Sequence, residues 1–105
     1  MKMLTKAIKK KLPKLYTTDG VKTEDKMVVC KFFTPWSNFT WYVFEGQMQE
    51  DLAGDWEFFG AVDIGYGEPE LGYFTLAQLT KIRSPAGLRV ERDYHFENVR
   101  FGDIK

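Results

Sequence analysis

Residues 27–45 read MVVCKFFTPWSNFTWYVFE, and this stretch decides the fold. The runs 27–33 and 39–45 are rich in Val, Phe, Trp and Tyr, which are the residue types that strands prefer. The connecting residues 34–39 include Pro, Ser and Asn, which are typical of turns. The stretch therefore predicts a β-hairpin.

Both faces of this hairpin carry large apolar side chains. In the second strand Trp41 and Val43 alternate with Tyr42 and Phe44, and alternate residues of a strand point to opposite faces. A sheet that is apolar on both faces needs cover on both, unless one face binds a partner. The sequence leaves open which face is exposed.

A second hairpin follows along the chain. Residues 56–64 and 71–75 read as strands, and the connection between them, Gly65-Tyr66-Gly67-Glu68-Pro69, holds two glycines that suit a turn with positive backbone dihedral angles. Residues 46–54 are acidic and are expected to form a flexible loop. Residues 88–96 alternate enough to predict a further extended segment, and the tail after Phe101 is expected to fray.

Two short helices flank these strands. The first carries apolar residues at helical spacing, with Thr5 as its N-cap and Pro13 as its end. The second begins at Thr75, and Gln78 lies three residues later, which is the spacing of a capping box. The predicted fold class is α+β, with a small antiparallel sheet of four to five strands packed with two short helices. At 105 residues the chain is expected to form a single domain, residues 1–105.

The net charge of zero hides a segregation of charge. Residues 1–31 hold nine Lys and three acidic residues, a net charge of +6. Residues 32–80 hold eight Asp and Glu and neither Lys nor Arg, a net charge of −8, and residues 81–105 carry +2. Such asymmetry suits a polar partner surface. The alternative is that the basic helix packs near the acidic loops and neutralises them.

Cysteine and histidine usage limits the chemistry. The chain holds one Cys and one His, so the clusters that bind zinc are missing, and no nucleotide-binding glycine loop is present. We therefore expect no cofactor and no metal. Cys30 is expected to be a buried small hydrophobic residue. A lone cysteine and the lack of a membrane-spanning apolar run point to the cytoplasm, with no membrane partner.

An enzymatic alternative rests on His95 and Asp93. Neighbouring acids can orient an imidazole for general-base work, so these two residues are the catalytic candidates of a nuclease or a nucleotide-acting enzyme. Clustered carboxylates would hold Mg²⁺ in that hypothesis, because hard cations take oxygen ligands. The candidates are Glu57, Asp63, Glu68 and Glu70.

A non-enzymatic protein that binds a protein partner is the favoured function. Exposed rings would supply contact area, and acidic residues would orient the partner. The candidate binding residues are Trp36, Asn38, Trp41, Glu70 and Tyr73. Nucleic acid is less favoured there, because the aromatic stretch has no basic residue after Lys31. The lysines of the first helix leave a nucleic-acid-binding module as a further alternative.

Several separated blocks resemble, in order, a bacterial family of unknown function, DUF2958. The blocks are 4–5, 12–16, 31–42, 58–60, 70–76 and 87–93. The resemblance implies a short protein encoded on a plasmid, a phage or another mobile element, and it carries over no catalytic residues. Small proteins in that setting often counter host defence by binding a defence protein or by sequestering a nucleotide signal. The resemblance thus adds counter-defence and a nucleotide ligand as expectations.

Overall fold

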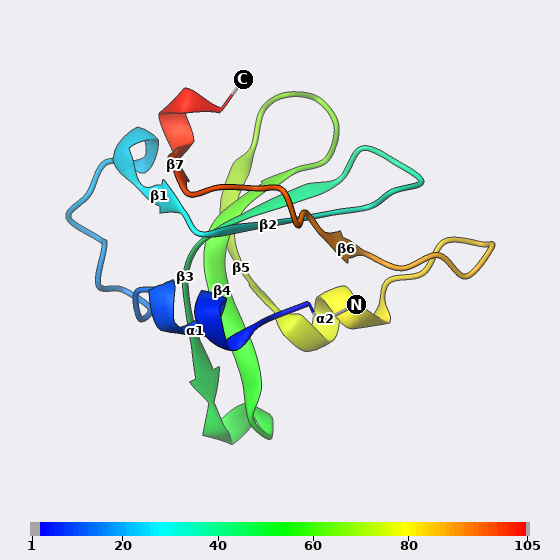
Figure 1. Cartoon of the computed structure of the whole chain (residues 1–105), viewed down its shortest axis with the longest axis horizontal. Coiled ribbons are helices and arrows are strands. Elements are labelled where there is room, and N and C mark those ends of the chain that lie inside the picture. Colours follow the sequence, from blue (N-terminus) through cyan, green and yellow to red (C-terminus); the bar gives the residue numbers. More distant parts are fainter. Residues whose placement is uncertain (1–2, 105) are drawn as a thin grey trace.

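The computed structural model of the chain describes residues 3–104 (Figure 1). Its main feature is a five-stranded antiparallel sheet with the strand order β5-β4-β3-β2-β6. The strands are β2 (Cys30–Phe33), β3 (Thr40–Gln49), β4 (Asp55–Asp63), β5 (Glu70–Thr75) and β6 (Glu91–Arg92). A separate two-stranded sheet pairs β1 (Met27–Val28) with β7 (Val99–Arg100). The predicted α+β class is confirmed.

The two predicted helices are present, and their caps are the predicted ones. They are α1 (Lys6–Lys11) and α2 (Leu76–Lys81). The Thr5 hydroxyl accepts a hydrogen bond from the Ile8 amide at 3.2 Å. The Thr75 hydroxyl accepts from the Gln78 amide at 3.1 Å, while the Gln78 side chain accepts from the Thr75 amide at 2.9 Å. Both starts therefore follow from local sequence, because each cap satisfies amides that the first turn leaves unpaired.

Both helices pack on the same face of the sheet, which we call the helix face. Leu12 beside α1 and Leu79 of α2 join one core cluster with Phe32, Trp41 and Phe58 from the strands. No helix within residues 3–104 is long and apolar enough to cross a membrane.

The opposite face is covered by segments without α-helix. The short 3₁₀ turns η1 (Thr23–Asp25) and η3 (Phe101–Asp103) lie over it together with β1 and β7. The Phe101 ring lies 5.3 Å from the Phe44 ring and 5.6 Å from the Tyr42 ring. The prediction of a frayed tail after Phe101 is wrong for residues 102–104, because η3 continues to Asp103 and Ile104 packs against the core cluster on this face.

Two further expectations need correction. Residues 46–54 are not one loop, since β3 runs to Gln49 and a short turn, η2 (Glu50–Leu52), leads into β4. Cross-strand pairs extend the ladder, such as Met48 with Trp56, and the Gln49 amide donates to the Glu57 carboxylate at 3.0 Å.

Segment 88–96 pairs with β2 only at Glu91 and Arg92. It then turns at Asp93, whose carboxylate accepts a hydrogen bond from the His95 amide at 2.9 Å. This side-chain bond draws the backbone away from the extended conformation and ends the strand.

Candidate functional site

The tips of the two hairpins lie side by side at one end of the sheet. Thr40 begins β3 and pairs with Asp63 at the end of β4, so the loops 34–39 and 64–69 emerge together. A Cβ atom on Gly65 would lie 2.9 Å from the Cβ of Asn38. The two loops thus form one continuous surface.

The first loop is fixed by hydrogen bonds within it. The Thr34 hydroxyl lies 2.7 Å from the Ser37 hydroxyl and accepts from the Phe39 amide at 3.1 Å. The Thr34 amide donates to the Phe39 carbonyl at 3.1 Å. Thr34 is buried, so these bonds are shielded from water and hold the turn in one conformation. Asn38 and Phe39 are exposed at this turn.

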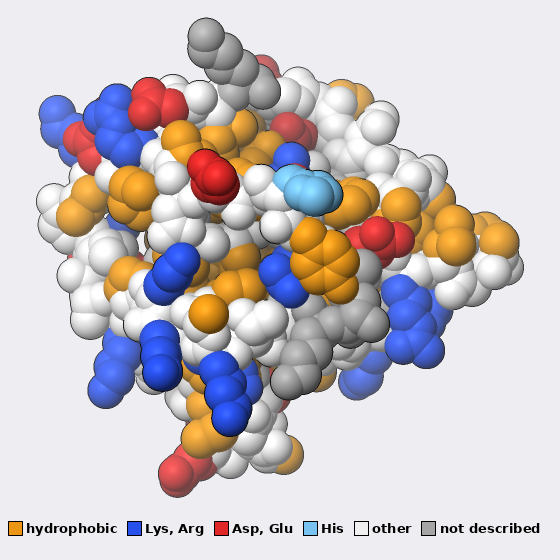
Figure 2. Space-filling model, in the orientation of Figure 1, with side chains coloured by type: hydrophobic (Ala, Val, Ile, Leu, Met, Phe, Trp, Pro, Cys, Tyr) orange, Lys and Arg blue, Asp and Glu red, His pale blue; other side chains and the backbone are white. Residues whose placement is uncertain are grey.

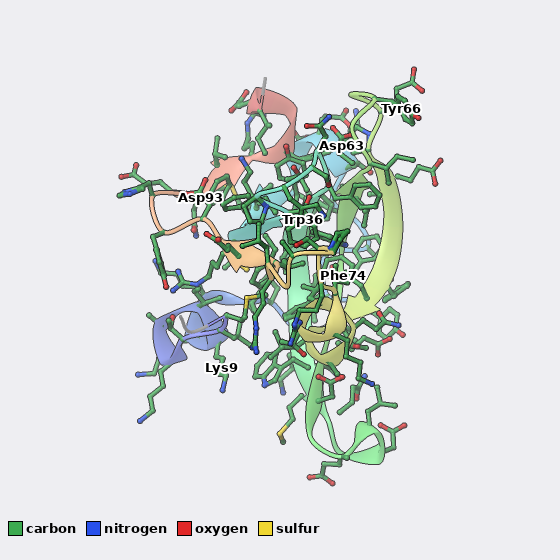
Figure 3. All side chains as sticks on the ribbon, turned by 90° about the vertical axis from the view of Figure 1, so that its right-hand side faces the viewer. Lys9, Trp36, Asp63, Tyr66, Phe74 and Asp93 are labelled. Atoms are coloured by element: carbon green, nitrogen blue, oxygen red, sulfur yellow. The ribbon has the colours of Figure 1, made fainter. Side chains whose placement is uncertain are left out.

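The second loop is shaped by Asp63. Its carboxylate accepts hydrogen bonds from the amides of Gly65 at 2.7 Å and Gly67 at 3.3 Å. Both glycines have positive φ, which the Asp-anchored turn requires and which other residues adopt at a cost. The loop holds Tyr66 outward with 80% of its surface exposed, the largest value among the exposed large hydrophobic residues (Figure 3).

Two hollows flank the second loop. The larger, about 410 Å³, lies on the face opposite the helices and is lined in part by Tyr42, Asp63, Phe101 and Glu24. Burial raises the pKa of Tyr42, and the negative charge of Asp63 raises it further. The smaller, about 180 Å³, lies on the helix face and is lined by Val62, Ile64, Tyr66, Glu68 and Glu70. Both hollows carry carboxylates, so the loop is acidic on either side.

The structure brings some of the predicted binding residues together and separates others. Asn38 and Glu70 are exposed near this end of the sheet. Trp41 stands in register with Val62, which pairs with Glu70, but the Trp41 ring is buried and contributes to the core. The Trp41 ring lies beneath this surface, 6.1 Å from the Phe39 ring, and offers a partner little contact area of its own.

Of the remaining two predicted binding residues, Trp36 belongs to the first loop and Tyr73 to strand β5. Trp36 is half-buried and packs against the main core cluster. Tyr73 is exposed on the face opposite Glu70, with its ring 5.0 Å from that of Phe59 and 6.1 Å from that of Tyr16. The core therefore covers part of the Trp36 ring, and the Tyr73 ring lies outside the surface that the hairpin tips form.

Sequence reasoning missed Phe39 and Ile64 as surface residues. Both read as strand residues, and strand periodicity alone does not tell an end position from a core position. They are 42% and 52% exposed, because each lies one step beyond the last paired residues, Thr40 and Asp63. The glycine that follows Ile64 was the available signal, since it marks the start of the turn.

The catalytic candidates His95 and Asp93 lie near the other edge of the sheet. The Asp93 carboxylate is 3.9 Å from the Lys31 amine, and it accepts a hydrogen bond from the backbone amide of His95. Within residues 3–104 the His95 imidazole has no hydrogen-bond partner. The carboxylate therefore shapes the turn, and it does not orient the imidazole as a general base requires.

The proposed carboxylate cluster does not assemble in the described part of the chain. Residues 3–104 contain no group of three or more His, Cys, Asp or Glu side chains placed to share a metal ion. The Asp63 carboxylate accepts hydrogen bonds from the loop amides. The Glu57 carboxylate accepts one from the Gln49 side chain on another part of the sheet.

A family model described as "Protein of unknown function (DUF2958)" matches residues 3–101. The match confirms the resemblance seen in the sequence blocks. No curated protein and no solved structure matched the chain.

Proposed function

Because the chain belongs to the family described as "Protein of unknown function (DUF2958)", which names no activity, we propose its function from its surface. We propose that it is a non-enzymatic binding protein and that the hairpin tips bind a protein partner. The surface, called here the acidic tip, consists of Asn38, Phe39, Ile64, Tyr66, Glu68 and Glu70.

The observation that carries the proposal is an exposed apolar patch surrounded by carboxylates. Phe39, Ile64 and Tyr66 are 42%, 52% and 80% exposed, while Glu68 and Glu70 beside them are exposed too. Contiguous apolar side chains rimmed by charge mark interaction sites, and a tyrosine at the centre is a common energetic anchor. A protein with basic residues around an apolar contact is the partner that complements this surface.

The rigidity of the loops supports a recognition role. The Thr34 and Asp63 side chains fix the two turns through the hydrogen bonds described above. A surface that is already ordered loses less conformational entropy on binding. The acidic tip is therefore preorganised for its partner.

The charge of the tip favours protein over nucleic acid there. Residues 32–80 contain no Lys or Arg, and both hollows beside the second loop carry carboxylates. Phosphates would meet like charge at this end, whereas a basic protein surface would gain in association rate and orientation.

Affinity purification from a native host tests the proposal with two matched variants. The tip variant carries Tyr66→Ser, Glu68→Gln and Glu70→Gln. The control variant carries Leu52→Ser, Glu50→Gln and Asp51→Asn in the turn η2 at the far end of the β3–β4 hairpin. Each variant loses one exposed apolar side chain and two negative charges.

We expect the wild type and the control variant to enrich the same protein, and the tip variant to bind it about 30-fold more weakly, as loss of a binding hot spot implies. Capture should weaken as salt rises, because exposed charges are screened. Equal enrichment by the tip and control variants, or no enriched protein even at low salt, contradicts the proposal.

We propose counter-defence in the cytoplasm as the setting of this binding. The family resemblance to proteins of mobile elements supports the setting, and the lone Cys30 is in keeping with a reducing compartment. A plasmid or phage that carries the gene should establish better in a host with an active defence system, and the tip variant should remove that advantage. If the plasmid or phage keeps its advantage with the tip variant, counter-defence does not depend on the acidic tip.

A further inference from the structure

A basic groove lies on the molecule away from the acidic tip. It has a volume of about 460 Å³, and its lining includes Lys9, Lys10, Lys14, Gln47, Met48 and Trp56. Figure 3 shows Lys9 and Tyr66 at opposite ends of the molecule, and Figure 2 shows Lys and Arg side chains gathered over the region of α1. We call this feature the lysine groove.

The backbone fixes the position of the lysines. The Gly46 amide donates to the Pro13 carbonyl at 2.9 Å, and the Leu15 amide donates to the Gln47 side chain at 3.1 Å. These bonds tie the segment after α1 to strand β3 on both sides of Lys14. The groove is thus formed by residues 9–14 held against β3, together with Trp56 of the neighbouring strand β4.

The lysines of the groove make no ion pair within residues 3–104. No carboxylate in this part of the chain lies within 4.0 Å of the amines of Lys9, Lys10 and Lys14. The basic helix therefore does not neutralise the acidic loops by direct pairing. It leaves three adjacent positive charges for a ligand.

An aromatic ring lies among these charges. The Lys9 amine lies 5.6 Å from the centre of the Trp56 ring, and Met48, which pairs with Trp56 across the strands, is 50% exposed. The Lys9 side chain is long and flexible, so its amine can move from the neutral Trp56 ring to a negatively charged ligand. Trp56 is half-buried and packs against the main core cluster, but part of it lines the groove. That part and Met48 would then offer an apolar surface between the charges.

We infer that the lysine groove binds single-stranded nucleic acid, a function beyond the proposed one and independent of the acidic tip. Phosphates pair with the three lysines, and an unpaired base stacks on Trp56, as aromatic rings do in proteins that bind single strands. A duplex keeps its bases stacked inside and would use only the charges. An acidic peptide without aromatic residues, such as polyglutamate, has no ring to place on Trp56.

Binding of a fluorescein-labelled 12-nucleotide oligothymidylate, followed by anisotropy at several salt concentrations, tests the inference. The groove variant carries Lys9→Gln, Lys10→Gln and Lys14→Gln. The control variant carries Lys6→Gln, Lys11→Gln and Lys22→Gln, which removes the same charge outside the groove. All six side chains are exposed, so circular dichroism should show both variants folded.

The groove variant should bind at least about tenfold more weakly, and its plot of log affinity against log salt should be shallower by about 2, the change expected for three lost phosphate contacts on a single strand. The control variant should change affinity less than about threefold. An equal loss in both variants would show a diffuse charge effect and overturn the inference, as would no binding by the wild type at low salt.

A second pair of measurements separates the ligand classes. Trp56→Leu should weaken oligothymidylate binding by about tenfold without changing the salt dependence, because stacking on one base carries no charge. Polyglutamate of matched charge should compete poorly with the oligonucleotide. Competition by polyglutamate at equal charge concentration, or an unchanged affinity in a folded Trp56→Leu variant, would contradict the assignment to nucleic acid.

Discussion

Glu45 shows how a single residue can depart from what its neighbours in sequence suggest. In the sequence it is one of eight acidic residues in a segment without basic ones. In the structure it is 1% exposed, and the ladder between β3 and β4 shifts register between Val43 and Glu45. This irregularity places Phe44 and Glu45 on the same face, which strand alternation alone cannot predict.

The Glu45 carboxylate fastens the segment after α1 to the sheet. It accepts hydrogen bonds from the amides of Tyr16 at 2.8 Å and Thr18 at 3.1 Å, and from the Thr18 hydroxyl. The amine of Lys26, which is 6% exposed, lies 4.0 Å away. Tyr16 has a φ of +72°, a conformation that the bond from its amide to Glu45 helps to hold.

Removing one partner of this buried pair should be costly. We predict that Glu45→Met lowers the free energy of unfolding by about 3–5 kcal/mol, because it leaves the buried Lys26 charge without compensation. The double variant with Lys26→Met should lose clearly less than the sum of the two single losses. Urea unfolding measures all four proteins, and additive losses would mean that the two side chains do not act as a pair.

Cys30 behaves as its sequence context predicts. It is buried at the start of β2 in the main core cluster, and the prediction of a small hydrophobic role is confirmed. Burial raises the pKa of its thiol from 9.0 to about 12, although the charge of Arg92 lowers it somewhat. The thiol therefore stays protonated and unreactive in the folded protein at neutral pH.

This shift predicts a pH dependence of stability. The folded state holds the Cys30 proton more tightly than the unfolded state, so the contribution is complete below pH 9.0 and is lost as pH rises toward about 12. Within that window the wild type should lose about 1.4 kcal/mol per pH unit more than Cys30→Ala does. Urea unfolding of both proteins at a series of pH values measures the difference, and parallel curves would refute the shift.

At the scale of the element, the helices and hairpins follow from local sequence. The Thr5 and Thr75 caps and the turns at 34–39 and 65–69 are signalled by residue types whose chemistry acts within a few positions. The structure of residues 46–54, at the far end of the β3–β4 hairpin, could not be predicted from local sequence. Polar pairs such as Gln47 with Glu57 and Gln49 with Asp55 extend that ladder, and such pairs depend on register.

The pairing of β3, β4 and β5 gives a matched test in two glycines. Gly60 of β4 pairs directly with Gly72 of β5. A Cβ atom on Gly60 would lie 1.9 Å from the Tyr42 carbonyl oxygen, whereas a Cβ atom on Gly72 would meet nothing within 4 Å. The same substitution therefore meets opposite conditions at two neighbouring positions.

We predict that Gly60→Ala destabilises the protein by about 3 kcal/mol or more, since backbone has to move to admit the methyl group. Gly72→Ala should change stability by less than about 1 kcal/mol, because a strand position with free space tolerates Ala. Thermal and urea unfolding compare the two. Similar losses at both positions would contradict the register of β4 against its neighbours.

At the scale of the whole molecule, the sheet is covered on both faces by different means. The alternation of Trp41 and Val43 with Tyr42 and Phe44 predicted two apolar faces, and both are found. The helices cover one face, while the segments 13–28 and 96–104 cover the other. The sequence could not predict this second cover, because the contacts of Phe101 with Tyr42 and Phe44 join residues nearly sixty positions apart.

The charge segregation of the sequence becomes a separation in space. The acidic tip and the lysine groove lie at opposite ends of the molecule, so one partner at each end can bind without competing with the other (Figure 3). The charge totals could be read from the sequence. The residues that turn each charged region into a surface, Phe39 and Ile64 at the tip and Trp56 in the groove, depend on the tertiary arrangement.

The measurement that tests the central claim most directly is site-specific photo-crosslinking in the native host. A benzophenone amino acid replaces Tyr66 in one protein and Leu52 in another. Both positions are exposed and lie beside acidic residues, but only Tyr66 belongs to the acidic tip. We predict a defined crosslinked protein from position 66 that is weakened by Glu68→Gln with Glu70→Gln, and no such product from position 52. The same product from both positions, or none from position 66, would contradict the claim that the acidic tip binds a protein partner.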